Sequence, residues 1–451
     1  MPLLKRKLQA DAEEKQRINK RVSSEPFRPT AAEAEQIRAI SAEIADEFRD
    51  EISEHGFTQQ IKEQIRAAIA KKADALDLGY ESQKRIEVLT ASNITGLGPI
   101  EPYIEDDTVT EIIVQRYDNI CIERAGLIYW VDAAFLSEAH LRNVIGKIVQ
   151  PIGRQINLYT PMVDARLHDG ARVNATIPPA SPDGATLTIR KFPEDIMTGQ
   201  DYIAAQSLNE KMLTFLSLCV RGRVNLIVSG GTTTGKTTLL NMLATYIPDN
   251  ELIVSIEDSC ELKLPQRNVR RLEARMINTE GMMPVTIQSL VRNALRMRPD
   301  RLIVGEIRDG TVVDMMSAMS TGHPGSMSTV HANSPQNLVS ARLPILYSMH
   351  TSVAFSEEAQ RLQIAEALQL IVQVDKLKNG QRKIISITHV AGLDNNKNVM
   401  LREIFRYNRS TDKFEATGYV PQRVLEQIQG AKLTVDMRLF RCEEGGKQAH
   451  E

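Results

Sequence analysis

The sequence predicts an α/β protein, with a C-terminal domain on a parallel sheet, a smaller α+β domain before it and an N-terminal helical region. Three observations support this fold class. A short apolar strand, a glycine-rich loop and a helix follow one another over Val224–Asn241. Strand and helix patterns alternate after Leu208, as in a parallel sheet covered on both faces. Upstream, GLGPIEP at Gly96–Pro102 marks a change from helical spacings to short strands.

These patterns divide the chain into five predicted parts. They are a disordered tail (1–30), a helical region (31–95), an α+β domain (96–205), the domain on the parallel sheet (206–415) and a C-terminal tail (416–451).

Length and composition are those of an ordinary globular chain. The 451 residues are 42% hydrophobic and 25% charged, enough for about three domain-sized units. The net charge of −2 gives no reason to expect general nucleic-acid binding. Four scattered cysteines without C-x-x-C spacing argue against a zinc site or disulfide framework and fit a reducing compartment. No apolar run reaches the ~18 residues that cross a bilayer, so we expect a cytosolic or peripheral membrane protein.

The first half of the chain changes from a polar tail to helices and then to strands. The tail mixes basic and acidic residues, which favours a solvated terminus over a basic cluster that binds lipid or a partner. Isoleucines at spacings of three and four then predict two or three amphipathic helices. The predicted elements are the helices within 31–89, strands at 110–115, 119–124 and 127–132, a helix at 137–149, and strands within 161–192 separated by Asp-Gly turns.

The loop after the strand at Val224 has the pattern G-x-x-x-x-G-K-T of a P-loop. Glycines let the backbone curl its N–H groups around a phosphate chain at a helix N-terminus. We expect Lys236 to reach the β- and γ-phosphates of ATP and the Thr237 hydroxyl to hold Mg²⁺. A Gly/Thr-rich turn that binds nothing is the weaker alternative, because strand, loop and helix occur in the required order. The predicted binding residues are Gly230, Gly231, Thr232, Thr233, Thr234, Gly235, Lys236, Thr237 and Thr238.

Two carboxylates end the next predicted strand. The strand over 251–257 finishes in Glu257 and Asp258. Strand ends in an open α/β sheet face the ligand crevice, so we expect this pair near the phosphates, in the metal shell. The alternative is a polar turn in which Asp258 caps a helix.

A third buried strand over 302–304 is followed by Gly305 and Glu306. Many P-loop enzymes carry an aspartate and then a glutamate here, one for the metal and one to orient the attacking water. Glu306 can orient the water, while the role of the aspartate must pass to the preceding carboxylate pair. Alternatively, Glu306 pairs with Arg308 or Arg296.

Two histidines lie in TGHPGSMSTVHANSP. His323 falls in a glycine-rich turn, and His331 follows a strand over 327–330. A metal pair is disfavoured, because no carboxylate or cysteine lies nearby at ligand spacing. A neutral imidazole at a strand tip could instead read the γ-phosphate, so His331, with His323 second, is a candidate for that role against a plain structural one.

The rest of the chain adds helices and a hairpin. Ser334 and Pro335 begin one helix, and another is expected over 356–370. Asn379-Gly380 between two apolar runs predicts a hairpin with a type I′ turn. A strand at 401–407 follows. From about Val420 we expect a frayed tail with a short helical pattern in VLEQIQ.

Arg166, Arg172 and Arg190 lie on or beside strands of the α+β domain that precedes the nucleotide-binding domain. For each arginine two readings remain open, a solvated surface cation or a phosphate contact.

Together, these motifs resemble those of the secretion-superfamily ATPases. The P-loop looks like the Walker A motif, Glu257–Asp258 like the Asp box, Gly305–Glu306 like an atypical Walker B motif and the histidine segment like the His box. GLGPIEP, TPMVDARLHDGARVNATIPP and TIRKF resemble more specifically the Tad/Flp pilus assembly ATPases, the CpaF-like branch. The resemblance covers about residues 90–410.

The resemblance implies a hexameric ATPase whose subunits hold Mg²⁺–ATP between a PAS-like N-terminal domain and a RecA-like domain. It implies that Arg166, Arg172 and Arg190 match arginines that reach the γ-phosphate in cis or from a neighbouring subunit. It also implies a motor at the cytoplasmic face of the inner membrane, acting on a platform protein that adds pilin subunits. Thr233 and Thr234 depart from the Gly-Ser of relatives, and no tetracysteine insert of type II secretion ATPases is present.

Other functions stay open at this stage. Within the family, a type IV secretion or archaeal-type pilus motor competes with Tad/Flp pilus assembly. A nucleic-acid translocase is disfavoured by the near-neutral charge and the lack of a base-stacking aromatic cluster. A nucleotide-binding scaffold without turnover is the third alternative.

Overall fold

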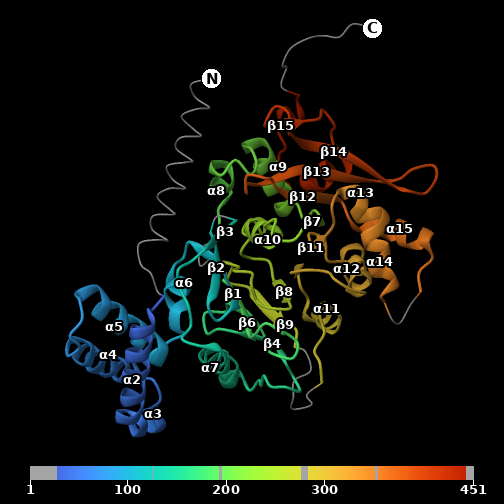
Figure 1. Ribbon diagram of the computed structural model, residues 1–451. Helices are drawn as coiled ribbons and strands as arrows, with labels where there is room; N and C mark the ends of the chain where they lie inside the picture. The colour runs from blue at the N-terminus through green and yellow to red at the C-terminus, as the bar shows by residue number, and fades with distance from the viewer. Residues whose placement is uncertain (1–27, 125, 192–195, 276–282, 351–353, 443–451) are drawn as a thin grey trace, which may run out of the picture. The chain divides into compact units, whose positions relative to one another are not determined.

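The structure is a computed structural model that describes residues 28–124, 126–191, 196–275, 283–350 and 354–442. The chain forms two compact units, Met1–Glu194 and Asp195–Glu451 (Figure 1). Each unit contains its own sheet, so the predicted α/β fold class is confirmed. The predicted disordered tail lies outside the described residues except for residues 28–30, and the finer division into five parts stays a prediction.

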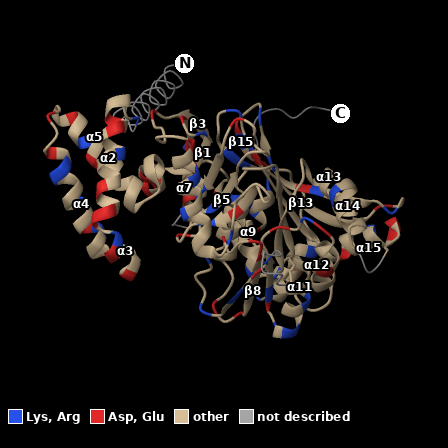
Figure 2. Cartoon of the chain, turned by 60° about the horizontal axis from the view of Figure 1, so that its bottom comes forward, with Lys and Arg blue, Asp and Glu red and all other residues tan. Residues whose placement is uncertain are grey.

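The N-terminal unit begins with helices, because isoleucines recur along one face of each long helix. Thr30 and Glu33 form a capping box at the start of the first of these helices. Four helices stand where two or three were predicted, since a cap at Phe48 divides the first pattern in two. Figure 2 shows acidic and basic residues interspersed along α2, α4 and α5. The helices are α2 (Ala31–Glu47), α3 (Arg49–His55), α4 (Gln59–Asp74) and α5 (Tyr80–Thr95).

The rest of the N-terminal unit is an antiparallel sheet of six strands in the order β3-β2-β1-β6-β5-β4. One core encloses Ile112, Val173 and Ile189 of the strands with Leu141 of the amphipathic helix α7. The elements are α6 (Glu101–Glu105), β1 (Val109–Arg116), β2 (Asn119–Arg124), β3 (Leu127–Trp130), α7 (Glu138–Val149), β4 (Met162–Arg166), β5 (Arg172–Thr176) and β6 (Thr186–Arg190).

The C-terminal unit is built on a nine-stranded sheet in the order β15-β14-β13-β12-β7-β11-β10-β8-β9. The six strands from β12 to β9 run parallel, and β13 to β15 extend the sheet antiparallel. The strands are β7 (Leu226–Gly230), β8 (Ile253–Glu257), β9 (Val269–Glu273), β10 (Arg301–Val304), β11 (Met327–His331), β12 (Leu370–Lys376), β13 (Arg382–Leu393), β14 (Val399–Asn408) and β15 (Lys413–Ala416).

Helices cover both faces of this sheet, which explains its uninterrupted apolar strands. Leu226 and Val228 of β7 belong to the core beneath α9, α10 and α16, whereas Ile227 belongs to the core beneath α11, α12, α14 and α15. The helices are α8 (Gly199–Ala204), α9 (Glu210–Arg221), α10 (Lys236–Ala244), α11 (Ile287–Ala294), α12 (Thr311–Ser320), α13 (Pro335–Asn337), α14 (Leu343–Ser348), α15 (Glu357–Ala367) and α16 (Gln422–Gly430).

Two local predictions were wrong. The residues after Val420 are not frayed as far as Phe440, because Val424, Ile428 and Phe440 are buried in the core that includes α9. The hairpin between β12 and β13 exists, but its turn is not type I′. Only Gly380 of residues 377–381 is left-handed, and the Gly380 N–H donates to the Leu377 carbonyl.

No helix in the described ranges combines the length and apolar character needed to span a bilayer.

Candidate nucleotide-binding site

The P-loop occupies the carboxyl end of β7, and two of its positions require glycine because of a close contact or a left-handed backbone. A Cβ at Gly230 would lie 2.5 Å from the Val374 carbonyl oxygen on β12. Gly235 caps α10 in the left-handed region, with φ of 88°. The Thr234 hydroxyl donates to the Gly231 carbonyl at 2.9 Å, which closes the loop on itself. The loop therefore ends where α10 begins, with the helix N-terminus facing into it.

Lys236 connects the loop to the neighbouring strand β11. Its ammonium group donates to the Gly231 carbonyl at 2.8 Å and lies 3.2 Å from Nε2 of His331. His331 comes to this place because it is the last residue of β11 and pairs with Gly230 in register. Burial, and next the charge of Lys236, lower the pKa of His331 below its ordinary value. A neutral imidazole is thus the form favoured near neutral pH.

Glu306 extends this chain of contacts toward β8. Its Oε1 lies 3.0 Å from His331 Nε2, and its Oε2 accepts a hydrogen bond from Arg308 at 2.6 Å. Arg308 also lies 3.1 Å from the Asp258 carboxylate. The alternative pairing of Glu306 with Arg308 therefore exists alongside its contact with the histidine. Arg308, which the sequence marked only as a possible ion-pair partner of Glu306, bridges the carboxylates of Glu306 and Asp258.

Glu257 is buried beside this chain and behaves differently from Asp258. Its Oε2 accepts the backbone N–H groups of Glu261 and Leu262 at 2.8 and 3.0 Å. The carboxylate that holds this turn is thus Glu257, not Asp258 as the alternative reading supposed. Burial raises the pKa of Glu257 to about 7. A Cβ at Gly305 would lie 3.0 Å from Glu257 Cγ, so the Glu257 side chain takes up space beside Gly305, where many P-loop enzymes carry an aspartate.

The three predicted arginines of the N-terminal unit stand in one row across its sheet. Arg166 on β4 pairs in register with Arg172 on β5, which pairs with Arg190 on β6. Residues directly opposite on neighbouring strands share a face, and like charges placed so repel one another. Such a row favours an anion beside it, and Glu111 of β1, directly opposite Arg190, supplies one carboxylate at its end. A further anion beside Arg166 and Arg172 would add to this balance. Whether that anion is a γ-phosphate stays a prediction.

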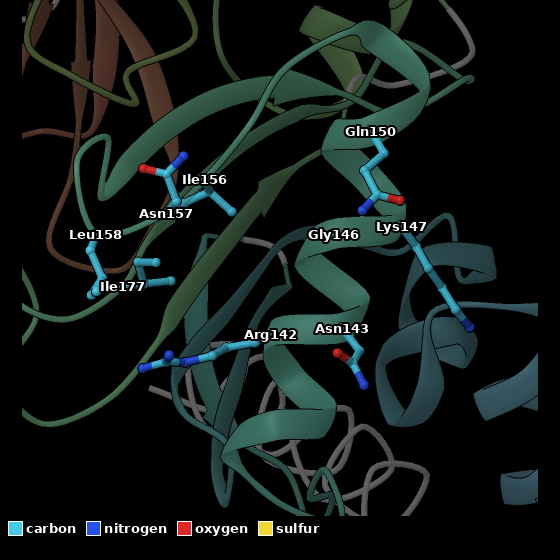
Figure 3. Close-up of a pocket in the computed structure, with 9 residues that line it drawn as sticks. All are labelled: Arg142, Asn143, Gly146, Lys147, Gln150, Ile156, Asn157, Leu158 and Ile177. Carbon is cyan, nitrogen blue, oxygen red and sulfur yellow. The ribbon is translucent and has the colours of Figure 1, made fainter.

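A pocket of about 660 Å³ lies elsewhere on the N-terminal unit, between α7 and the segment 156–158 (Figure 3). It contains none of the predicted site residues. Lys147 points away from it and donates to the carbonyls of Asn93, Ile94 and Gly96. The lining residues are Arg142, Asn143, Gly146, Lys147, Gln150, Ile156, Asn157, Leu158 and Ile177.

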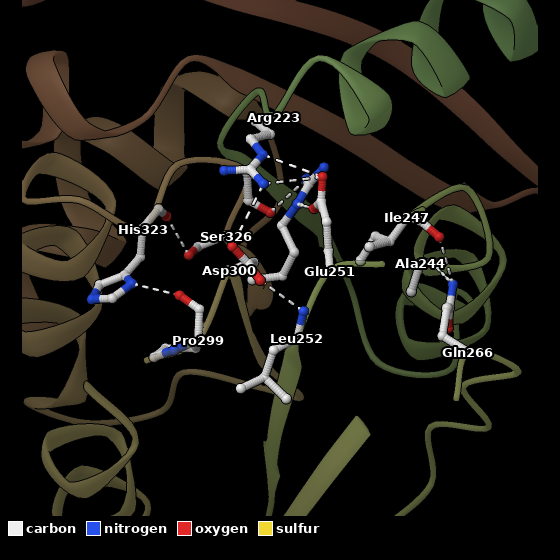
Figure 4. A network of polar contacts seen from close by, with 12 residues as sticks. Arg223, Ala244, Ile247, Glu251, Leu252, Gln266, Pro299, Asp300, His323 and Ser326 are labelled. Carbon is white, nitrogen blue, oxygen red and sulfur yellow. Dashed lines mark hydrogen bonds and ion pairs between the residues drawn. The ribbon is translucent and has the colours of Figure 1, made fainter. Parts of the chain in front are cut away.

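His323 is not brought to the Lys236–His331–Glu306 chain within the subunit. It precedes β11, whereas His331 ends that strand, so the two histidines lie at opposite edges of the sheet. His323 Nδ1 donates to the Pro299 carbonyl at 2.9 Å, and its own carbonyl accepts from Ser326 (Figure 4). The prediction that His323 reads the γ-phosphate is therefore wrong within this subunit. The eight positions from His323 to His331 include the whole of β11, so the two side chains lie at opposite ends of that strand.

The site fits a nucleotide and a metal in its donor chemistry. Lys236, Thr237 and Thr238 begin α10 directly after the left-handed Gly235, and such a helix N-terminus is a setting that binds phosphates. Among the described residues no group of three His, Cys, Asp or Glu side chains is placed to hold a metal alone. Mg²⁺ commonly takes most of its ligands from phosphates and water, so Thr237, Asp258 and Glu257 stay predicted rather than assigned ligands.

Comparison with known proteins places these motifs in a family. The model of the type II/IV secretion system protein family matches residues 93–422. A putative conjugal transfer protein of Mycobacterium tuberculosis is 32% identical over 302 residues, which are 66% of this chain and 85% of that protein. The type IV secretion system protein VirB11 of Bartonella quintana is 32% identical over 278 residues, which cover 53% of this chain and 77% of that protein. The crystal structure of the VirB11 ATPase of Brucella suis with sulphate is 26% identical, covering 66% of this chain and 96% of that one with a TM-score of 0.36.

Proposed function

We propose, since this chain belongs to the type II/IV secretion system protein family, that it is an ATP-hydrolysing motor of a secretion or pilus machine. The observation that carries the proposal is the continuous chain of contacts from Lys236 in the P-loop through His331 to Glu306. P-loop enzymes cleave the γ-phosphate with a lysine on the phosphate loop and a residue that orients the attacking water, and Lys236 and Glu306 supply both.

Each side chain has a distinct task in this proposal. The P-loop and Lys236 bind and orient the phosphates, and bound Mg²⁺–ATP supplies the phosphoryl group that water attacks. Glu306 orients that water and accepts its proton, as a carboxylate fixed by two neighbours can. His331, a neutral imidazole 3.0 Å from Glu306, senses whether the terminal phosphate is present. The arginine row, Arg166, Arg172 and Arg190, would stabilise charge that develops on the transferred group.

Two finer assignments divide the proposal. GLGPIEP and the segment TPMVDARLHDGARVNATIPP support a Tad/Flp pilus assembly motor. Relatives named for conjugal transfer and for type IV secretion give equal support to a type IV secretion motor. In either case we propose a homohexamer that binds an inner-membrane platform protein and associates peripherally with the cytoplasmic face of that membrane.

The test measures phosphate release from Mg²⁺–ATP by the purified full chain. Glu306→Ala and Lys236→Ala should lower turnover by about 10² to 10³-fold, because proton transfer and phosphate orientation each contribute about that much. Glu358→Ala, which removes an exposed carboxylate paired with Lys397, is the matched control and should keep full turnover. Unfolding curves of all variants should agree within about 1 kcal/mol.

Three outcomes would overturn the proposal or redirect it. Full turnover by Glu306→Ala would remove the water-orienting role. Nucleotide binding by the wild type without any phosphate release would favour a scaffold. Strong stimulation by DNA or RNA, absent with membranes that contain the platform protein, would favour a translocase.

A further inference from the structure

The P-loop holds a residue in a conformation that its side chain disfavours. Thr233 has a φ of 60°, in the left-handed region, and is exposed. A β-branched side chain rarely occupies this region, so surrounding contacts must hold it there. The Thr233 carbonyl accepts a hydrogen bond from Nε of Arg382 at 3.1 Å. Arg382 is the first residue of β13 and lies 149 positions further along the chain.

The same arginine covers the second left-handed residue of the loop. A Cβ at Gly235 would lie 3.2 Å from Cδ of Arg382, so the aliphatic stem packs over this glycine. Gly235 is the N-cap of α10, whose first residue is Lys236. One side chain therefore fixes Thr233 through a directed N–H and Gly235 through its stem. These two residues set the path of the backbone between Gly231 and the helix.

Arg382 is itself held by the segment that precedes α9. The Ser207 hydroxyl donates to the Arg382 carbonyl at 2.7 Å, and the Ile384 N–H donates to the Ser207 carbonyl at 2.9 Å. Ser207 is buried, with 7% of its surface exposed. These two bonds fix the backbone at the start of β13, so that the Arg382 side chain stays beside the P-loop.

We propose that Arg382 is a positioning residue, which holds the P-loop in its phosphate-binding shape from outside the motif and is itself aligned by Ser207. The proposal rests on the proposed nucleotide-binding function of the loop. It requires arginine in particular, because lysine keeps the charge and much of the stem but has no N–H at the Nε position. A displacement of the Ser207 segment would change the loop through this single side chain.

The experiment measures binding of a fluorescent ADP analogue together with KM and kcat for ATP. Arg382→Ala should weaken ADP binding and raise KM about tenfold, as loss of a hydrogen bond from a charged group does, with kcat within about threefold of wild type. Arg382→Lys should be impaired nearly as much. Arg406→Ala is the control: it removes an arginine of β14 that pairs with Glu415 of β15 in the same sheet, and it should bind ADP as the wild type does.

Ser207→Ala tests the second half of the proposal. It should weaken ADP binding in the same direction, by about twofold to threefold, and add nothing when combined with Arg382→Ala, because the two residues act in series. Unfolding curves identify any variant that is merely misfolded.

The outcomes separate this inference from the proposed function. Wild-type affinity in Arg382→Lys would show that charge rather than the directed bond matters and would overturn the positioning role. Independent, additive effects of Ser207→Ala and Arg382→Ala would overturn the link to Ser207. A wild-type protein that neither binds ADP nor hydrolyses ATP would instead overturn the proposed function.

Discussion

The parallel strands of the nine-stranded sheet end in charged side chains on both sides. We call the side where the strands finish the carboxyl edge and the side where they begin the amino edge, and the charged groups are organised differently on the two. At the carboxyl edge, Glu306 shares its carboxylate between His331 and Arg308, and the Arg308 side chain remains about half exposed. At the amino edge, Arg301 is fully buried against Glu251. Asn225 there satisfies all of its side-chain groups, accepting from Gly325 and Ser326 and donating to two carbonyls.

This difference separates the polar groups that stabilise the fold from those that are available for function. Groups at the amino edge are buried among protein partners, with Glu251 held by both Arg301 and Arg223, so they define the start of the strands and cannot exchange partners without cost. Groups at the carboxyl edge are partly exposed, so a phosphate, a metal or water could replace their partners. Substitutions should therefore affect folding at one edge and turnover at the other.

The largest effect should come from Glu251→Ala at the amino edge. The variant leaves the Arg301 guanidinium buried without its carboxylate, a change that costs about 3–5 kcal/mol in the free energy of unfolding. Urea unfolding measures this loss. Glu358→Ala, at an exposed ion pair, is the control and should lose at most about 1 kcal/mol. Equal losses of unfolding free energy in the two variants would mean that the buried Glu251–Arg301 pair contributes no more to stability than an exposed ion pair.

The second prediction concerns Glu257, a carboxyl-edge residue that is buried like those of the amino edge. Its pKa of about 7 lies above the ordinary 4.5, so the folded protein keeps a proton that the unfolded chain has lost. The free energy of unfolding therefore falls as pH rises from about 4.5 to about 7, by up to about 3 kcal/mol. Glu257→Gln does not titrate and should lack this component.

Unfolding of the wild type and of Glu257→Gln at about pH 5 and about pH 8 checks this sign. The variant should gain stability relative to the wild type as pH rises. Parallel pH profiles would show that Glu257 is ionised in the folded protein and available as a metal ligand.

The smallest effects separate the two histidines. His331→Ala should lower ATP turnover about tenfold without unfolding the protein, because the contact between Lys236 and Glu306 is interrupted. His323→Ala should leave turnover within about twofold and cost about 1 kcal/mol of stability, for the lost bond to Pro299. If both variants stay folded and lose turnover equally, His323 would belong to a nucleotide site that another subunit completes.

Most helices and strands, and the phosphate loop, could be predicted from local patterns in the sequence. Strand, glycine loop and helix around Lys236 depend on neighbours in sequence, and so does the continuous run of buried residues along β7. The edge strands β9 and β15 escaped prediction, because half-exposed strands of four or five residues carry weak patterns. The buried helix α16 was mistaken for part of a frayed tail, because its apolar face has meaning only against α9.

Only the tertiary structure decided which predicted site residues meet. Register between β7 and β11 brought His331 to Lys236, and the length of β11 removed His323 to the far edge. Cross-strand pairing aligned Arg166, Arg172 and Arg190 in one row. Sheet order, finally, carried Arg382 to Thr233, although no local pattern marks it. The physical reason is that propensity and periodicity act over a few residues, whereas partner choice depends on how strands far apart in sequence align.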